Sequence, residues 1–335
     1  NETTVNVRGF DIKHVPIFQD GIPIYVPYDG YPDLGRFTTF DLSEVVLSKG
    51  FTSVLYGPNT MGGAINMVSK RPRDVFEMNA GAGYGSGNTY TAYGNFGANQ
   101  GKWYVQGGGA YVDSDYFRVS SDFTPTVTED GGQRENSYRR DWKVNMKVGW
   151  TPNETDEYAF SYIDQNGKKG VPPYAGTDPS TAPRFWQWPY WDKQSFYFNS
   201  NTALGDRSYV KTRLYYDMFD NSRFAFDDDT YSTMRKRSSF KSYYDDHTTG
   251  GSIEMGTSLV PRNMLRLAFH YKRDIHKEHN DPNPIQRFED EIYSIGLEDT
   301  IDITDRFYAI LGMSYDHLET LQAQNLSTAG KLEDF

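Results

Sequence analysis

Residues 141–151 read DWKVNMKVGWT, and their polarity alternates with a period of two residues. Because successive side chains of a β-strand point to opposite faces, this alternation predicts a strand with one apolar and one polar face. The apolar face carries an aromatic residue at each end, as the series Trp142, Val144, Met146, Val148 and Trp150. Eight residues of a tilted strand at about 3.3 Å each climb roughly 20 Å, close to the ~25 Å apolar band of an outer-membrane barrel.

Later segments repeat this pattern, for example Phe307, Ala309, Leu311, Met313 and Tyr315. The alternative is a soluble β-sandwich, whose strands also alternate. A sandwich would not bracket its apolar faces with aromatics, nor alternate short and long connections. Here short links alternate with mostly long ones: short at 99–101, 205–206, 260–263 and 303–305, long at 114–136, 167–193, 222–244 and 279–289. Such alternation is typical of the periplasmic turns and extracellular loops of a transmembrane barrel.

Composition agrees with this interpretation and excludes several classes of protein. The 335 residues include no cysteine, which excludes disulfides, thiolate metal sites and cysteine nucleophiles. A net charge of −11 argues against a nucleic-acid partner, because duplex binding needs a basic face. The mean hydropathy of −0.71 is compatible with a barrel, in which only alternate strand residues face lipid. The 16% aromatic content suits a membrane interface, where aromatic rings concentrate.

The chain is predicted to contain two domains. Residues 1–72 have short, mixed segments typical of a small α+β domain, with strands at 5–8, 15–19 and 64–69, a helical turn or strand start at 41–47 and a short helix at 53–55. Residues 73–335 are predicted to form about eleven barrel strands. Barrels with a plugged lumen have about 22 strands, and an odd number cannot close in one bacterial chain. We therefore expect a mainly β fold, half of a transmembrane antiparallel barrel, in a chain that is part of a longer protein.

Three blocks of the sequence are similar to one known protein family. Residues 54–72 (VLYGPNTMGGAINMVSKRP), together with VRGF at 7–10 and FQDGIP at 18–23, resemble the TonB-dependent receptor plug domain. The ending NMVSKRP resembles the siderophore-receptor branch more than the cobalamin branch. The Gly-Gly at 62–63 would permit backbone conformations that a β-carbon forbids.

The resemblance implies a receptor in the bacterial outer membrane, surrounded by lipid and lipopolysaccharide. Such receptors take up a scarce extracellular chelate, most often a ferric siderophore. Periplasmic TonB, with its inner-membrane energising complex, drives uptake by gripping a TonB box, which we expect ahead of the residues present. Uptake of another metal complex, cobalamin or a glycan is an alternative. A passive pore or adhesin without energy coupling is another, and a degraded gene fragment is a third.

The family's apical plug loop corresponds to residues 24–37, which we expect to face the ligand. Its candidate ligand-binding residues are Tyr25, Tyr28, Asp29, Tyr31, Asp33 and Arg36. Tyrosine rings and a guanidinium can stack on and hydrogen-bond a planar, anionic chelate. The alternative is that these tyrosines pack against the barrel wall.

A second candidate is the extracellular loop at 171–191, whose residues Tyr174, Arg184, Trp186 and Trp188 suit a ligand lid. An aromatic girdle at the outer rim is the alternative and is favoured for Tyr190 and Trp191. The resemblance also implies that Arg8 and Lys49 contact the barrel, since the family uses an arginine pair to lock the plug to barrel glutamates. Lys49-Gly50-Phe51 replaces the family's Arg-Gly-Pro, and lysine lacks the forked geometry of arginine.

No catalytic arrangement is predicted, and we expect no enzymatic activity, no cofactor and no metal site. The run Asp227-Asp228-Asp229 has the oxygen ligands that calcium prefers, although a solvated loop tip explains it as well. His276 and His279 are three residues apart, so on a strand they would lie on opposite faces and could not share a metal ion.

Overall fold

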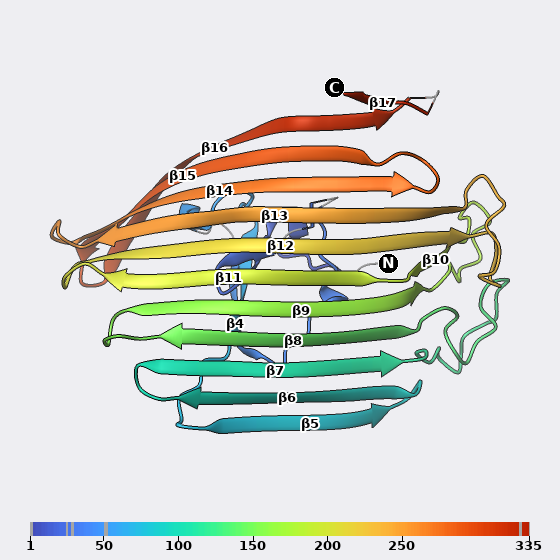
Figure 1. Cartoon of the computed structure of the whole chain (residues 1–335), viewed down its shortest axis with the longest axis horizontal. Coiled ribbons are helices and arrows are strands. Elements are labelled where there is room, and N and C mark those ends of the chain that lie inside the picture. Colours follow the sequence, from blue (N-terminus) through green and yellow to red (C-terminus); the bar gives the residue numbers. More distant parts are fainter. Residues whose placement is uncertain (1–2, 25, 28–29, 50–52, 328–329, 335) are drawn as a thin grey trace.

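The computed structural model describes residues 3–24, 26–27, 30–49, 53–327 and 330–334. These residues form a small four-stranded sheet and a large antiparallel sheet of thirteen strands (Figure 1). Three short 3-10 helices, η1 (Ile12–His14), η2 (Leu34–Arg36) and η3 (Val54–Tyr56), accompany the small sheet. Among the described residues, no helix has the length and apolar character needed to cross a membrane.

The small sheet has the strand order β2-β1-β4-β3. Its strands are β1 (Ile17–Gln19), β2 (Ile22–Ile24), β3 (Leu42–Lys49) and β4 (Gly63–Ser69). The hairpin of β1 and β2 turns at Asp20 and Gly21, which both have positive φ angles. Ile12, Ile17, Ile24 and Met67 form its buried core. We call residues 3–71 the plug.

Two expectations for this region change. Residues 5–8 were expected to form a strand, and that expectation is wrong: only an isolated bridge joins Val7 to Phe10. Arg8 and Gly9 between them have φ angles of 51° and 86°, a tight turn that extended backbone cannot accommodate. Of residues 41–47, for which a helical turn or a strand start was expected, all but Asp41 belong to β3.

The glycine pair is required by close packing. Gly63 has a φ of 135°, and a β-carbon there would lie 2.3 Å from the backbone oxygen of Ser48. A β-carbon on Gly62 would lie 2.4 Å from the Cβ of Phe10. No larger residue could bring β4 this close to β3 and to the Val7–Phe10 turn.

The large sheet, which we call the wall, consists mainly of eleven long strands in sequence order. They are β5 (Glu77–Gly85), β6 (Thr89–Asn99), β7 (Trp103–Ser114), β8 (Arg139–Trp150), β9 (Glu157–Val171), β11 (Trp191–Ala203), β12 (Ser208–Phe226), β13 (Phe240–Thr257), β14 (Asn263–Asn280), β15 (Gln286–Thr304) and β16 (Phe307–Leu326). The short β10 (Phe185–Trp188) lies between β9 and β12 beyond the end of β11, and β17 (Leu332–Asp334) pairs with β16.

The alternation predicted for residues 141–151 is present in β8. Trp142, Val144, Met146 and Trp150 are 37–49% exposed on the convex face. Asp141 and Lys143 are only 2% and 4% exposed on the opposite face. The exposed apolar band and the buried charges therefore lie on opposite sides of one strand, as in a barrel whose lumen is polar.

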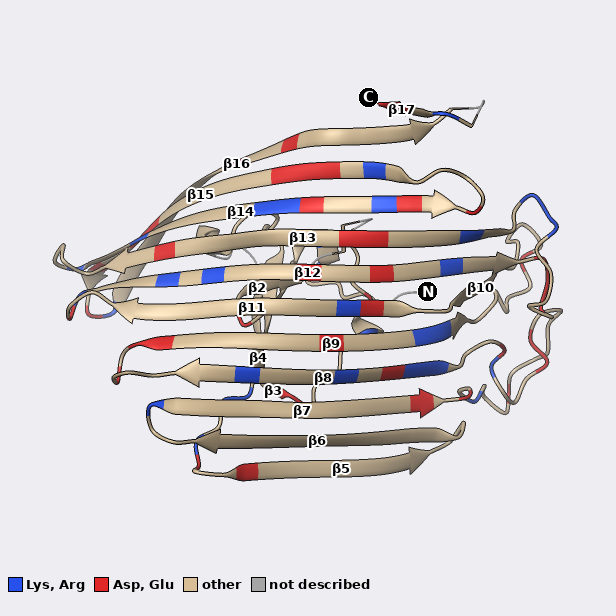
Figure 2. Ribbon diagram, viewed as in Figure 1, with Lys and Arg blue, Asp and Glu red and all other residues tan. Residues whose placement is uncertain are grey.

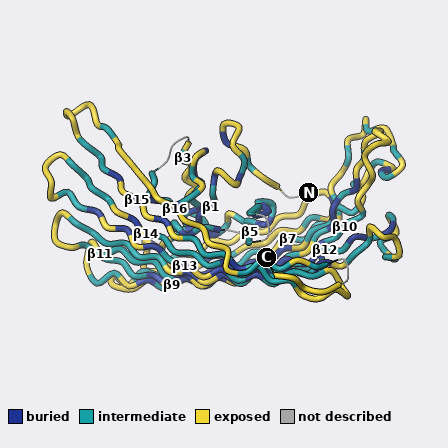
Figure 3. Tube along the Cα trace, turned by 90° about the horizontal axis from the view of Figure 1, so that it is seen from above, coloured by how far each residue is buried: buried dark blue, intermediate teal, exposed yellow. Residues whose placement is uncertain are grey.

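Connections at the two ends of the wall differ in length. The turn end is defined by the short connections at 100–102, 151–156, 204–207, 258–262 and 305–306. The loop end is defined by the connections at 86–88, 115–138, 172–184, 227–239 and 281–285. The loop after β9 is shorter than the predicted 167–193, because Lys169, Gly170 and Val171 still pair with β10. The wall curves into a trough, and the plug lies on its concave side (Figure 3).

Candidate functional site

A cavity of about 900 Å³ lies at the loop end, between the 172–184 loop and the adjoining strands. We call it the loop-end cavity. The residues that line it with polar or aromatic side chains are Arg134, Tyr174, Ser180, Thr181, Arg184, Phe185, Trp186, Phe226, Ser238 and Phe240. Three separate segments of the chain thus meet around one concave space, the usual setting of a small-molecule site.

A cation lies beside two aromatic rings that line this cavity, those of Trp186 and Phe240. The guanidinium of Arg223 lies 4.7 Å from the Trp186 ring centroid and 5.4 Å from that of Phe240. Arg184 approaches the same Trp186 ring at 4.7 Å. The Nε of Arg223 is buried without a hydrogen-bond partner, and no carboxylate among the described residues forms an ion pair with this guanidinium. Its positive charge is therefore held by aromatic faces and by the Tyr244 hydroxyl, to which its Nη2 donates at 3.4 Å.

The β7–β8 loop contributes a second cation, Arg134, whose charge is balanced by a carboxylate. Arg134 forms an ion pair with Glu129 at 2.5 Å and donates to the backbone oxygen of Pro173. Burial opposes ionisation of Glu129, but Arg134 and the Glu135 and Gly131 amides outweigh it and lower the pKa of the carboxyl. Thr128 donates to the backbone oxygen of Tyr174, so the two loops brace each other.

Asp227 organises the β12–β13 loop. Its carboxylate accepts hydrogen bonds from the Ser239 hydroxyl, the Lys236 and Arg235 amides and the Thr233 hydroxyl. The Ser239 hydroxyl and these amides lower the pKa of Asp227 well below its usual range. Protein donors thus fill the carboxylate, and no group of three or more metal-ligating residues occurs in the described part of the chain.

The predicted lid residues lie at different depths in the structure. Tyr174, Arg184 and Trp186 line the loop-end cavity, whereas Trp188 is 5% exposed and lies deeper. The ammonium of Lys169 stands 4.9 Å over the Trp188 ring. Trp191, expected in an outer girdle, instead points inward and packs against Phe219 and the plug residue Phe37. Its register opposite Asn221 puts it on the concave face of the wall.

The described residues of the apical plug loop contact the plug core or the wall. Tyr31 donates to Asp11 at 3.1 Å and packs on the plug core. Arg36 is 2% exposed and pairs with Asp141 of β8. Asp33 caps η2 by accepting from the Gly35 amide and pairs with Lys169 of β9. Tyr25, Tyr28 and Asp29 lie outside the described residues.

The electrostatics of Asp33 follow from this position. Burial alone would raise the pKa of the carboxyl, but the Lys169 charge and hydrogen bond, with the Thr3 amide, bring the pKa below its usual value. Asp20 behaves in the same way: Lys147 and Ser69 outweigh burial and lower its pKa. Both carboxylates are therefore ionised partners of wall lysines.

The two predicted plug–barrel contacts lie on exposed parts of the plug. Arg8 occupies the exposed turn between Val7 and Phe10, and Lys49 ends β3, which is exposed along most of its length. Their role stays a prediction about barrel strands beyond this wall.

The histidines follow their predicted faces. His276 points inward, stacks between Tyr244 and Phe288 and lies 2.6 Å from Asp246. His279 stacks on Tyr243, the neighbour of Tyr244 that points the other way.

Arg134, Arg223 and Phe240 were not among the candidate ligand-binding residues predicted from the sequence. Arg223 and Phe240 lie close to the ends of β12 and β13, where each strand enters a long loop. Register would have placed Arg223 on the same face as Tyr215 and Phe219, but its proximity to Trp186 depends on the pairing of β10 with β12.

Residues 1–64 match the model of the family described as TonB-dependent Receptor Plug Domain. Three solved structures share the fold of the chain. The copper transporter OprC has a TM-score of 0.79 at 16% identity, over 99% of this chain and 54% of that chain. The FrpB iron transporter from Neisseria meningitidis (F3-3 variant) gives 0.75 at 14% identity, over 98% and 54%. The siderophore receptor PiuA from Acinetobacter baumannii gives 0.74 at 13% identity, over 100% and 55%. This chain spans about half the length of these proteins.

Proposed function

We propose that this chain, which carries the plug domain of the TonB-dependent receptors and a barrel wall of their fold, is part of an outer-membrane receptor for active uptake of an anionic metal chelate, foremost a ferric siderophore. Residues 1–72 are the plug side of that receptor and residues 73–335 its barrel side. Its partners are the extracellular chelate, periplasmic TonB with its energising complex, and outer-membrane lipid and lipopolysaccharide. It has no enzymatic activity and no resident cofactor.

The observation that carries this proposal is the Arg223 guanidinium beside the rings of Trp186 and Phe240, two residues that line the loop-end cavity. A cation whose neighbours are aromatic faces attracts a planar anion by charge and by stacking. Arg184 adds a second positive charge on the same Trp186 ring. Ferric catecholates and hydroxamates combine planar groups with oxygen-rich surfaces, which suits such a lining.

The similar solved structures support metal uptake without choosing the metal. They name a copper transporter, an iron transporter and a siderophore receptor. We place Tyr174, Arg184 and Trp186 in the ligand site on the strength of the cavity that they line. We also retain Tyr31, Asp33 and Arg36 of the apical plug loop as proposed ligand contacts on the plug side.

The test is binding and uptake with a panel of radiolabelled ligands: ferric catecholate, ferric hydroxamate and ferric citrate chelates, copper ion, cobalamin and an oligosaccharide. Cells that express the complete gene are compared with cells that lack it, each with and without TonB. We expect TonB-dependent uptake of an iron chelate and repression of the gene by iron. Uptake of cobalamin or a glycan alone would replace the chelate assignment, and ion conduction with the plug in place would support a passive pore.

A further inference from the structure

Five ion pairs join the plug to two neighbouring wall strands, β8 and β9. Lys143 and Lys147 of β8 pair with Asp41 and Asp20, each at 2.7 Å. Three more pairs connect the plug to the same strands: Arg36 with Asp141, Lys169 with Asp33, and Arg71 with Glu157. Figure 2 shows the basic residues of β8 spread along its length. The plug is thus attached to this part of the wall from the loop end to the turn end.

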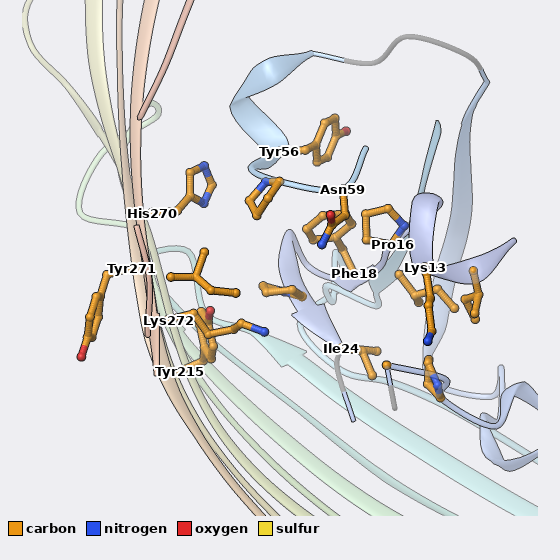
Figure 4. A pocket seen from close by; sticks show the side chains of 17 residues that line it. Lys13, Pro16, Phe18, Ile24, Tyr56, Asn59, Tyr215, His270, Tyr271 and Lys272 are labelled. Carbon is orange, nitrogen blue, oxygen red and sulfur yellow. The ribbon is translucent and has the colours of Figure 1, made fainter. Parts of the chain in front are cut away.

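Cavities lie between the plug and a different part of the wall, formed by β12, β13, β14 and β15. The plug also contacts this part, through the hydrogen bond of His270 with the Leu55 backbone oxygen and the packing of Ile22 with Tyr215. One cavity of about 100 Å³ lies between plug residues such as Phe18 and Ile24 and wall residues such as Tyr215 and Lys272. Figure 4 shows His270 and Lys272 pointing toward the plug and Tyr271 pointing to the opposite face of the wall. A second cavity of about 300 Å³ continues toward the turn end and shares Tyr56 and His270 with the first.

Basic side chains outnumber acidic ones on the wall side of the second cavity, which we call the lower cavity. Lys211, Arg213 and Arg266 line it together with one wall carboxylate, Glu254. Lys211 and Arg213 share the Glu254 carboxylate, which lies 3.5 Å from the first and 3.8 Å from the second. Arg266 pairs with Glu298 behind the lining, and its Nε is buried without a hydrogen-bond partner. Three cations against two carboxylates leave a surplus of positive charge.

The plug approaches this cationic group through a glycine. Gly21 has a φ of 78°, and a β-carbon there would lie 2.6 Å from the Nε of Arg213. On the plug side, Asp20 is engaged by Lys147 and Ser69. It therefore does not neutralise the wall cations.

We infer that the lower cavity is a second binding site for an anionic chelate, occupied while the ligand passes between the plug and β12–β14 as the ion pairs hold the plug to β8 and β9. This inference rests on the proposed function. The first cavity reaches Tyr215 and Lys272 in the middle of the wall and adjoins the lower one at Tyr56 and His270. Because the surplus charge is positive, it favours anions over cations of the same size.

The charge of the lower cavity can be tested without a known ligand. Ser53 lines the cavity and the chain has no cysteine, so Ser53→Cys places a single thiol there. In the purified complete receptor, we compare the reaction rates of sulfonatoethyl and trimethylammonioethyl methanethiosulfonate, which carry opposite charges. Relative to a Ser86→Cys reference in the exposed β5–β6 turn, we expect the anionic reagent to be favoured about tenfold. Adding Arg213→Gln should remove most of this preference, while Arg207→Gln in an exposed turn should not.

The passage is tested by locking the plug on either side. A β-carbon on Gly312 of β16 would lie 3.3 Å from Cγ1 of Val54, so Val54→Cys with Gly312→Cys can form a disulfide between η3 and the wall. On the other side, Asp41→Cys with Lys143→Cys can be joined by a short bismaleimide. We expect the first lock to abolish uptake of the chelate identified by the panel, reversibly on reduction. The second should leave at least half of the uptake.

The outcomes separate this inference from the proposed function. Loss of uptake in the η3 lock with unchanged chelate binding at the loop end supports the inference. Full uptake in that lock, or no preference for the anionic reagent at Ser53→Cys, overturns it. If no chelate of the panel binds, the proposed function fails, and the reagent preference alone then decides whether the lower cavity accepts anions.

Discussion

Lys143 donates a hydrogen bond to Asp41 across 2.7 Å, although 102 residues separate them in the sequence. The Lys143 side chain is 5% exposed and that of Asp41 is fully buried. Removing two charges from water is costly, and only their mutual attraction and hydrogen bonding offset that cost. This pair therefore depends on the plug lying against β8.

Replacing Lys143 by methionine should loosen the plug. The substitution leaves the Asp41 carboxylate buried without its cation, a situation that typically costs about 3–5 kcal/mol. We expect the plug to become accessible to protease at a lower urea concentration in the complete receptor. Exposed Lys102→Met is the matched control and should not change the midpoint. Adding Asp41→Leu should restore much of the loss, and a double variant as unstable as Lys143→Met would contradict the explanation.

Acid should weaken the same attachment. The pKa values of Asp20 and Asp33 are lowered by Lys147 and Lys169, so their contribution to stability is complete above the unfolded pKa of about 3.9. It is lost as the pH falls through the still lower folded values. We therefore expect the urea midpoint for plug release to be similar at pH 7 and pH 5 and to drop below about pH 4.

The control for this pH dependence is the double variant Asp33→Asn with Lys169→Met, which removes one ion pair. Its midpoint should fall less between pH 5 and pH 3 than that of the native protein. An identical fall in both proteins would show that other groups are responsible.

Much of the wall could be predicted from sequence because alternation is a local property. The two faces of β8 follow from the period-two pattern of residues 141–151, and the aromatics at its ends follow from the membrane interface. The plug was predicted from resemblance, and its family match agrees. Residues 5–8 were mispredicted as a strand because a positive φ at Arg8 leaves no signal in an otherwise β-prone segment.

The candidate site was less predictable, because it is built from strand pairing over long sequence distances. Trp186 was a candidate for its aromatic ring alone, but Arg223 enters the site only because β10 pairs with β12. The buried position of Arg36 likewise depends on Asp141, 105 residues away. Charge type in a sequence does not reveal whether an arginine will meet a ligand or a carboxylate of its own chain.

Arg223→Gln should weaken binding of an anionic chelate. The variant keeps a polar side chain beside Trp186 and Phe240 but removes the charge and the cation–π contacts. Because the bound anion loses a charge-assisted contact, typically worth about 1.5–3 kcal/mol, we expect the Kd to rise roughly tenfold or more. Equilibrium binding of the radiolabelled chelate measures it. Arg207→Gln removes the same charge at the turn end and should leave Kd unchanged, whereas equal effects of both variants would point to net charge alone.

Gly63→Ala should destabilise the plug through its backbone. An alanine at a φ of 135° is strained, and its β-carbon would meet the Ser48 oxygen at 2.3 Å. We expect a loss well above 1 kcal/mol, seen as earlier protease cleavage of the plug. Gly9→Ala shares a positive φ but meets no atom within 4 Å, so its effect should be smaller. Equal losses would mean that φ alone matters and that the contact with β3 does not.

Asp227→Ala should disorder the β12–β13 loop without any involvement of calcium. The carboxylate holds the loop closed by accepting hydrogen bonds from Ser239, Arg235 and Lys236, so its removal frees several donors at once. We expect hydrogen exchange of residues 227–239 to speed up at least tenfold. Chelate binding should weaken as well, since Ser238 and Phe240 line the loop-end cavity.

Asp229→Ala, at an exposed position in the same acidic run, is the matched control and should change neither measurement. Calcium or EDTA should leave the exchange of the native loop unaltered, because protein donors already surround Asp227; slower exchange with calcium would restore the metal-site interpretation of the run.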